Sequence, residues 1–338
     1  MPDESEIISK IRRRARRTNS VIVGIGDDAA VLSTGDGKEL VVCCDLMVEG
    51  VHFRRAWAPP KLIGRKSLAV SLSDIAAMGS VPRFATISVA LPRDCSSEFI
   101  DELFEGICEL ADSCGVSLVG GDTSSSPDSL FIDSMVIGEC ERGKAITRSG
   151  ARAGDMICVT GNLGASALGL MLLEQGARLG ESEPSAETAE RMDWQALMNH
   201  LAPVPRLQLG IGLAGRELAT AMIDISDGLS TDLSHVLEES GVGAVIRADS
   251  IPIARCVESL AAGSSTIDSL HLALHGGEEY ELLFTARPEA KAEIEKLASE
   301  LGTPITTIGD VVTGAGIQLE REGTLERVVP AGFEHSIS

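Results

Sequence analysis

Aromatic residues, basic residues and long apolar runs are all scarce in this chain of 338 residues. Phe, Trp and Tyr make up only 3% of it, so the core must be built from aliphatic side chains. Lys and Arg number 29 against 50 Asp and Glu, which gives a formal net charge of −21. A surface of that sign repels nucleic acid and anionic membranes, because both are bound through basic area. We therefore expect no nucleic acid and no membrane as a partner.

Signals for export and for membrane insertion are also lacking. No apolar run approaches the roughly 20 residues that span a bilayer, and no secretory signal is evident. A predicted N-terminal helix carries five arginines between residues 12 and 17, but the acidic residues before them argue against a transit peptide. The eight cysteines show no Cys-x-x-Cys spacing, which argues against a zinc site or a disulfide framework. These features favour a reducing compartment and a cytoplasmic protein.

The common nucleotide-binding signatures are missing too. The chain has no Gly-x-x-x-x-Gly-Lys-Ser/Thr loop and no protein-kinase motif set. The turn Thr160-Gly161-Asn162-Leu163-Gly164 precedes a predicted helix, whose N–H groups could hold a phosphate. An ordinary tight turn is the alternative for this segment.

Aspartates next to glycine, serine or cysteine recur where apolar segments are predicted to end. The five clusters are Gly26-Asp27-Asp28, Cys44-Asp45, Ser73-Asp74, Gly121-Asp122 and Asp224-Ile225-Ser226-Asp227-Gly228. One such aspartate is typically a turn residue or a helix cap. Five clusters that converge on one cleft would repel one another unless cations lay between them. Magnesium prefers oxygen ligands, so the pattern predicts a magnesium centre.

The hydrophobic pattern predicts two domains, at 1–145 and 146–338, with mixed α and β elements. The clearest helix covers 97–114, where the apolar residues follow a period of 3.6, and another is expected over 62–78. Strands are expected over 41–44, 116–119, 130–137, 156–159, 221–225 and 280–285, a helix over 288–301, and a hairpin around Glu322-Gly323. The predicted fold class is α+β, with sheets covered by helices on one face.

Seven short blocks stand in register along nearly the whole chain. They are Gly24-Ile25-Gly26-Asp27-Asp28-Ala29-Ala30, Asp45-Leu-Met-Val-Glu-Gly-Val-His52-Phe53, Ser73-Asp74-Ile-Ala-Ala-Met-Gly79, Gly120-Gly121-Asp122-Thr123, Thr147-Arg148-Ser149-Gly150, Ile223-Asp224-Ile-Ser226-Asp227-Gly228-Leu229 and Gly276-Gly277-Glu278-Glu279-Tyr280-Glu281-Leu282. Together they resemble the thiamine-monophosphate kinases, within the ATP-binding superfamily typified by aminoimidazole ribonucleotide synthetase.

This resemblance implies a two-domain α+β fold of the aminoimidazole ribonucleotide synthetase type, paired as a homodimer through its N-terminal sheets. The implied reaction converts ATP and thiamine monophosphate into ADP and thiamine diphosphate with several Mg²⁺ ions. Matched by position, the implied metal ligands are Asp28, Asp45, Asp74, Asp122, Asp224 and Asp227. The implied ATP contacts are Gly121, Asp122, Arg148 and Ser226. The implied substrate contacts are His52, Glu278 and Phe333.

Physical chemistry agrees with this assignment. The acceptor phosphate is already ionised at neutral pH, so we expect no general base. The difficulty is that two anions must approach each other, and Mg²⁺ and the fixed charge of Arg148 would reduce their repulsion. Glu278 could pair with the cationic thiazolium or with the aminopyrimidine of the substrate. The alternatives are a structural His52, a domain-linking Arg148 and a turn carboxylate at Glu278, and Asp27 could cap a helix rather than touch metal.

Three positions depart from the family pattern. Cys43 and Cys44 stand where serine or threonine is expected, and magnesium does not favour a thiol ligand. Glu279 replaces an aspartate. The aromatic that stacks on thiamine in relatives has only Phe333 as a counterpart, with Pro330 where a tryptophan might sit.

Two other functions fit the sequence less well. A sister enzyme of the superfamily, acting on another small substrate, should carry a functional cysteine in an N-terminal glycine-rich loop or at the C-terminus. No cysteine precedes Cys43, and the chain ends in Ser338. A non-enzymatic acidic metal-binding protein would need EF-hand spacing or a continuous acidic tract, and the sequence has neither.

Overall fold

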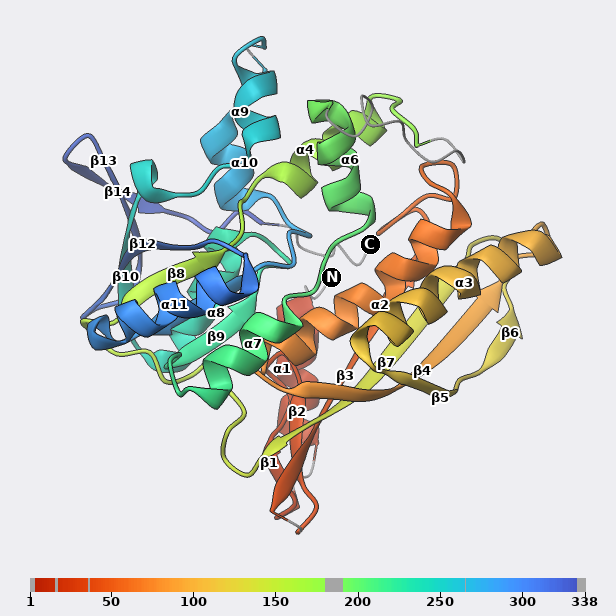
Figure 1. The fold of residues 1–338 in the computed structure, drawn as a ribbon, viewed down its shortest axis with the longest axis horizontal. Helices are drawn as coiled ribbons and strands as arrows, with labels where there is room; N and C mark the ends of the chain where they lie inside the picture. The colour runs from red at the N-terminus through yellow and green to blue at the C-terminus, as the bar shows by residue number, and fades with distance from the viewer. Residues whose placement is uncertain (1–3, 16–17, 36, 180–190, 265, 333–338) are drawn as a thin grey trace.

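The computed structural model describes residues 4–332 except 16–17, 36, 180–190 and 265. Two seven-stranded sheets form successive halves of the chain (Figure 1). The last strand of the first sheet ends at Glu141 and the first strand of the second begins at Met156. The predicted division at 145/146 therefore falls in the connection between the two sheets. None of the described helices is long and apolar enough to cross a membrane.

The first half is a mixed sheet with helices on one face. Its strands, in spatial order, are β1 (Val21–Val23), β2 (Ala30–Ser33), β3 (Lys38–Val48), β7 (Phe131–Glu141), β4 (Val81–Leu91) and β5 (Ser117–Gly120), with β6 (Thr123–Ser125) also paired to β4. Its helices are α1 (Glu4–Arg14), α2 (Pro60–Ala77) and α3 (Ser97–Cys114). Helices α2 and α3 lie together over the inner face of the sheet (Figure 1).

The second half is a mixed sheet with helices on both faces, so the prediction of coverage on one face is wrong here. Its strands, in spatial order, are β14 (Thr324–Val328), β13 (Gly316–Arg321), β10 (Gly243–Arg247), β12 (Ile305–Val312), β8 (Met156–Thr160), β11 (Leu282–Ala286) and β9 (Ala221–Asp224). Cys158 and Phe284 pack in one core with α7 (Leu207–Gly215) and α11 (Lys291–Leu301). Ile157 and Leu283 pack in another core with α8 (Leu229–Ser240).

The remaining elements surround the second sheet. They are α4 (Ala165–Glu174), α6 (Met192–Leu201), α9 (Arg255–Ala261), α10 (Ser269–His275) and the short 3₁₀ helices η1 (Ala248–Ser250) and η2 (Pro288–Ala290). The α6 helix packs against α4, and α7 packs against α2 of the first half. One apolar core accordingly contains Leu72 of α2, Leu213 of α7 and Phe284 of β11, and it joins the two halves.

The predicted elements with strong periodicity are confirmed, and several boundaries are corrected. Helix α3 matches its prediction at both ends, where Ser96 caps the N-terminus by accepting from the N–H of Phe99 and Gly115 ends it with φ of +68°. The hairpin of β13 and β14 is also confirmed. Strand β3 was predicted to end at Asp45 but continues to Val48, because all eleven of its residues pair with β7. Strand β11 begins at Leu282 rather than at 280.

Candidate active site

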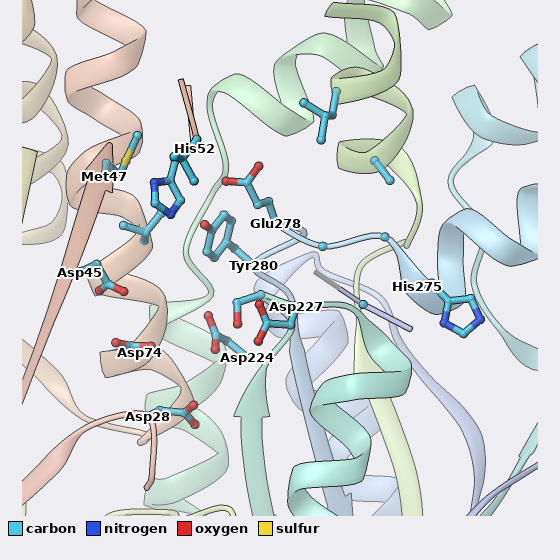
Figure 2. A pocket seen from close by; sticks show the side chains of 18 of the residues that line it. Asp28, Asp45, Met47, His52, Asp74, Asp224, Asp227, His275, Glu278 and Tyr280 are labelled. Atoms are coloured by element: carbon cyan, nitrogen blue, oxygen red, sulfur yellow. The ribbon is translucent and has the colours of Figure 1, made fainter. Parts of the chain in front are cut away.

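A pocket of about 670 Å³ lies between the two halves and contains most of the predicted site residues. Figure 2 shows Asp45, Asp74 and Asp28 in a column on one side, with Asp224 and Asp227 facing them. The column comes from the first half: Asp45 is on β3, Asp74 is on α2 and Asp28 precedes β2. Asp224 is the last residue of β9, and Asp227 follows in the loop to α8.

Three carboxylates from three elements form the centre of this site. Ligand oxygens of Asp28, Asp74 and Asp224 all lie within 4.8 Å of one another. Burial and the neighbouring carboxylates raise the pKa of Asp74 well above its usual value and raise that of Asp224 to about 8. Buried carboxylates this close repel one another when ionised, so the arrangement favours a cation among them.

The bonding of Asp28 supports the same conclusion. Arg148 donates to Oδ1 of Asp28 from Nε at 3.0 Å and from a terminal nitrogen at 2.5 Å. Oδ2 of Asp28 is buried and has no hydrogen-bond partner among the described residues. A buried carboxylate oxygen without a donor is costly unless a ligand completes it. The oxygen-only donor set and this orphaned atom fit a hard divalent cation such as Mg²⁺.

Asp27 holds the backbone around this group. Its carboxylate accepts from the N–H of Arg148 at 3.3 Å and from the N–H of Asp28 at 3.1 Å. Burial and the charge of Asp28 raise the pKa of Asp27 to about 7. Asp27 therefore connects the loop before β2 to the segment that carries Arg148.

Two serines of α2 orient the carboxylates across the pocket. Ser71 donates to Oδ2 of Asp45 at 2.7 Å, and Ser73 donates to Oδ2 of Asp224 at 2.6 Å. The serines near Asp74 on α2 thus contact the acidic site. Asp45 lies inside β3 rather than at its end, with its side chain on the inner face between the buried Cys43 and Met47.

The two cysteines of β3 point to opposite faces of the sheet. Cys43 is buried, and its thiol donates to the carbonyl of Ser71 at 3.2 Å. Its sulfur belongs to a second group of close ligand atoms, with Asp45 and Asp74. Burial, followed by the charges of those two aspartates, raises the pKa of Cys43 well above its usual value. Cys44 is exposed on the outer face.

Asp122 and Gly121 are not brought to this pocket. Asp122 is exposed between β5 and β6, where its Oδ1 accepts from the N–H of Thr123 at 2.9 Å. Gly121 has φ of +153°, and a Cβ there would lie 1.8 Å from the carbonyl oxygen of Ile87. The close approach of the two backbones therefore requires glycine at this position.

Another part of the pocket wall carries the predicted substrate contacts. His52, Glu278 and Tyr280 line the pocket, above the aspartates in Figure 2. Nδ1 of His52 accepts a hydrogen bond from the N–H of Val48 at 2.9 Å. His52 therefore fixes the local backbone and also lines the pocket. Phe333 lies outside the described residues, but Gly332, its neighbour in the chain, lines the pocket.

The N–H donors where the glycine-containing turn at 160–164 meets α4 are bound by a side chain of the protein itself. A carboxylate oxygen of Glu279 accepts from the N–H groups of Gly164 and Ser166, at 2.8 and 3.2 Å, at the start of α4. These are the donors that a phosphate would need, so the phosphate-loop hypothesis for this turn is wrong. The carboxylate of Glu279 thus lies at a helix N-terminus, where a negative charge is favourable.

Sequence reasoning missed three residues around the site. Asp232 accepts from the N–H groups of Asp227 and Gly228 and fixes their loop. Lys66 and His200 are buried behind Glu278. The position of Lys66 directly before a run of apolar and serine residues, 67–73, is the signal that could have marked it.

Two family models match the chain in succession. The model described as AIR synthase related protein, N-terminal domain, matches residues 26–140, and that of the C-terminal domain matches residues 152–322. Fold and site therefore define a two-domain protein of the AIR synthase related class.

Similar proteins show which family within this class the chain belongs to. The thiamine-monophosphate kinase of Bacillus subtilis is 37% identical over 340 residues, covering 98% of this chain and 99% of that protein. The structure of AaThiL complexed with AMPPCP and TMP has a TM-score of 0.83 at 30% identity and covers 99% of this chain and 97% of that one. The thiamine-monophosphate kinase structure from Stenotrophomonas maltophilia has a TM-score of 0.77 at 37% identity, covering 94% and 96%. The chain belongs to the thiamine-monophosphate kinase family, and the resemblance drawn from its seven blocks is confirmed.

Proposed function

We propose that this protein phosphorylates thiamine monophosphate with ATP and forms thiamine diphosphate and ADP. The observation that carries the proposal is the buried group of Asp28, Asp74 and Asp224 with an orphaned oxygen, beside an arginine, in a pocket between the halves. Relatives over the whole chain carry the name of this kinase, and AaThiL binds AMPPCP and TMP. The pocket of about 670 Å³ is within the range of small-molecule sites.

We infer that several Mg²⁺ ions bind the carboxylates of Asp28, Asp45, Asp74, Asp224 and Asp227. When bound, they would neutralise the donor and acceptor phosphates and align them for direct in-line transfer. Ser71 and Ser73 hold two of these carboxylates in orientation before any ligand arrives. Preorganised donors of this kind lower the reorganisation that the site must undergo.

Arg148 and Ser226 are the proposed ATP contacts within the pocket. Arg148 lies next to Asp28 and can meet a phosphate oxygen without leaving the cluster. Its fixed charge would stabilise the transferring phosphoryl group. No general base is needed, because the acceptor oxygen is already ionised. His52, Glu278 and Phe333 are the proposed contacts to thiamine monophosphate.

We also propose a homodimer formed through the N-terminal sheets. The outer face of the first sheet carries exposed apolar side chains: Leu46 (53% exposed), Phe84 (46%) and Val119 (59%). An apolar face of a sheet left open to water is typical of an interface. Asp122 and Gly121 adjoin this face, and their proposed contacts with metal and ATP would require a site completed by a partner. With all eight cysteines free, we expect the enzyme in the cytoplasm.

The test is product analysis with MgATP and a panel of acceptors. Thiamine monophosphate should yield thiamine diphosphate, whereas thiamine and simple phosphate monoesters should not react. ATP turnover with another acceptor, and none with thiamine monophosphate, would show a sister enzyme of the superfamily. Metal binding without any ATP turnover would show a non-enzymatic acidic protein.

A further inference from the structure

Lys66 is a fully buried lysine in the middle of α2. It is 2% exposed, whereas the other basic residues of this helix, Lys61 and Arg65, are only partly buried. A buried ammonium group is strongly unfavourable unless it is paired and hydrogen-bonded. Its Nζ lies 3.0 Å from Oε1 of Glu278 and 3.5 Å from Nε2 of His200. Lys66 is thus behind the pocket wall, whereas Glu278 forms part of that wall.

His200 completes the surroundings of the Glu278 carboxylate. Burial, followed by the charge of Lys66, lowers the pKa of His200 to about 3, so its ring is neutral. Because an ammonium group only donates, Nε2 of His200 must accept from Lys66, and the ring proton is then on Nδ1. Nδ1 lies 3.3 Å from Oε2 of Glu278 and 3.1 Å from the hydroxyl of Ser166. Each oxygen of Glu278 therefore lies close to a protein nitrogen, Nζ of Lys66 for Oε1 and Nδ1 of His200 for Oε2. Ser166 and Glu278 share the Nδ1 proton.

The backbone of Glu278 is fixed as firmly as its side chain. Glu278 has φ of +60° and Tyr280 has φ of +52°, a conformation that is unfavourable for residues other than glycine. The N–H of Glu278 donates to the carbonyl of Ser226 at 2.7 Å, and that of Tyr280 donates to the carbonyl of Ile225 at 2.8 Å. Strain maintained by surrounding bonds is typical of a residue whose exact placement matters for binding.

The charges in this group cancel. Lys66 contributes one positive charge, His200 none, and Glu278 one negative charge. Burial alone would raise the pKa of Glu278, but the charge of Lys66 more than offsets it and lowers that pKa, so the carboxylate stays ionised. The group differs in this respect from the aspartate cluster across the pocket, where only Arg148 opposes several carboxylates. A cationic ring gains little net attraction from a neutral pair, whereas a hydrogen-bond donor still finds the free lone pairs of an ionised carboxylate.

We propose that Lys66 and His200 are positioning residues for Glu278, and that Glu278 recognises the neutral amino group of the substrate's aminopyrimidine through a hydrogen bond rather than its cationic ring through charge. This inference rests on the proposed function. It also assigns the two ends of the substrate to different chemistry, with the phosphate at the aspartate cluster and the aminopyrimidine at Glu278. Because α2 belongs to the first half and α6 to the second, Glu278 is oriented only when the two halves are packed together.

The first arm of the test uses Lys66→Met, with Lys61→Met as its control. Lys61 is in the same helix with its side chain 39% exposed, and it pairs with Glu105 and Glu109. Loss of a hydrogen bond to a charged group predicts that Lys66→Met raises the KM for thiamine monophosphate about tenfold to a hundredfold. The KM for ATP should stay within about twofold, and Lys61→Met should change neither constant.

The second arm separates positioning from folding. Lys66→Met alone leaves the Glu278 charge unpaired and should lower the melting temperature. The double variant Lys66→Met with Glu278→Gln removes both charges and should restore the melting temperature, while the KM for thiamine monophosphate stays raised. Recovery of both, or an equal rise in both KM values, would show a purely structural role. If Lys66→Met does not fold, His200→Asn and His200→Leu test the positioning role instead. Asn keeps a donor at the position of Nδ1, so His200→Asn should retain a KM for thiamine monophosphate near that of the native protein. His200→Leu lacks the donor and should raise this KM.

The third arm tests the recognised group directly by measuring binding of thiamine monophosphate and of its analogue with hydrogen in place of the amino group, which lacks the donor. The native protein should bind the analogue at least about tenfold more weakly, and Glu278→Gln should lose most of this preference. Equal binding of both compounds to the native protein would overturn the inference. Absence of thiamine diphosphate formation by the native protein would instead overturn the proposed function, so the two failures are distinguishable.

Discussion

The hydroxyl of Ser73 donates a hydrogen bond of 2.6 Å to Oδ2 of Asp224 and so links the two halves of the molecule at the acidic site. Ser73 belongs to α2 and Asp224 ends β9, and both side chains are buried. The bond turns Asp224 toward Asp28 and Asp74 without requiring a ligand. Domain packing and the geometry of the proposed metal ligands are therefore coupled through this contact.

Ser73→Ala should weaken magnesium binding while leaving the fold intact. Removal of a donor from a buried carboxylate should cost about 1–3 kcal/mol of stability and allow Asp224 to turn away. We expect the Mg²⁺ concentration for half-maximal rate to rise several-fold. Ser67→Ala is the matched control, since the hydroxyl of Ser67 donates only within its own helix, to the carbonyl of Gly64. An equal magnesium requirement in both variants would contradict the coupling.

Asp45→Asn should abolish turnover with little change in the circular dichroism spectrum. The amide has the same shape but loses the charge that binds a divalent cation, and Ser71 can still donate to its oxygen. Asp101→Asn, at an exposed position of α3, serves as the control. Near-normal activity of Asp45→Asn would remove Asp45 from the proposed ligands.

Asp122→Asn addresses the residue that lies outside the pocket of the single chain. If a partner completes the site, this variant should lose most of its activity. Separate disruption of the outer sheet face by Phe84→Asp should then lower both activity and the mass measured by light scattering. Full activity of Asp122→Asn would contradict the assignment of Asp122 as a ligand.

The metal-free protein should lose stability as the pH rises. The pKa values of Asp27 and Asp224 are raised to about 7 and about 8 in the folded state, from 3.8 in an unfolded chain. Between pH 3.8 and these raised values the folded state holds more protons than the unfolded state. The free energy of unfolding therefore falls as the pH increases through that window. Mg²⁺ binds the ionised carboxylates, so it should raise the melting temperature more at pH 8.5 than at pH 6. A metal-free melting temperature that rises over this range, with Asp224→Asn behaving like the native protein, would contradict this account.

Glu279→Ala should destabilise the protein by about 1 kcal/mol, because two N–H groups at the start of α4 lose their acceptor. Glu279→Gln retains an acceptor oxygen and should cost less. Urea unfolding of the two variants, compared at the same pH, measures the difference. Identical midpoints for Glu279→Ala and the native protein would show that the helix end is satisfied in another way.

The sequence predicted the helices with strong periodicity and the residue types of the site, but not the way in which they meet. Helix α3 could be predicted because its period and its cap are local properties. Strand β3 was cut short at Asp45, since a carboxylate inside a strand is unfavourable until Ser71 of another element satisfies it. Lys66 was missed for the same reason: its partners, Glu278 and His200, lie more than 130 residues away in the chain. Asp122 was grouped with the other aspartates by motif, although the fold of one chain keeps it apart.

Transfer of radioactive phosphate from [γ-³²P]ATP is the most direct measurement of the central claim. In the presence of Mg²⁺ and thiamine monophosphate, the label should appear in the terminal phosphate of thiamine diphosphate, with one ADP formed for each labelled product. Asp45→Asn should give neither. ADP formation without labelled thiamine diphosphate, or label in another acceptor, would contradict the proposed reaction.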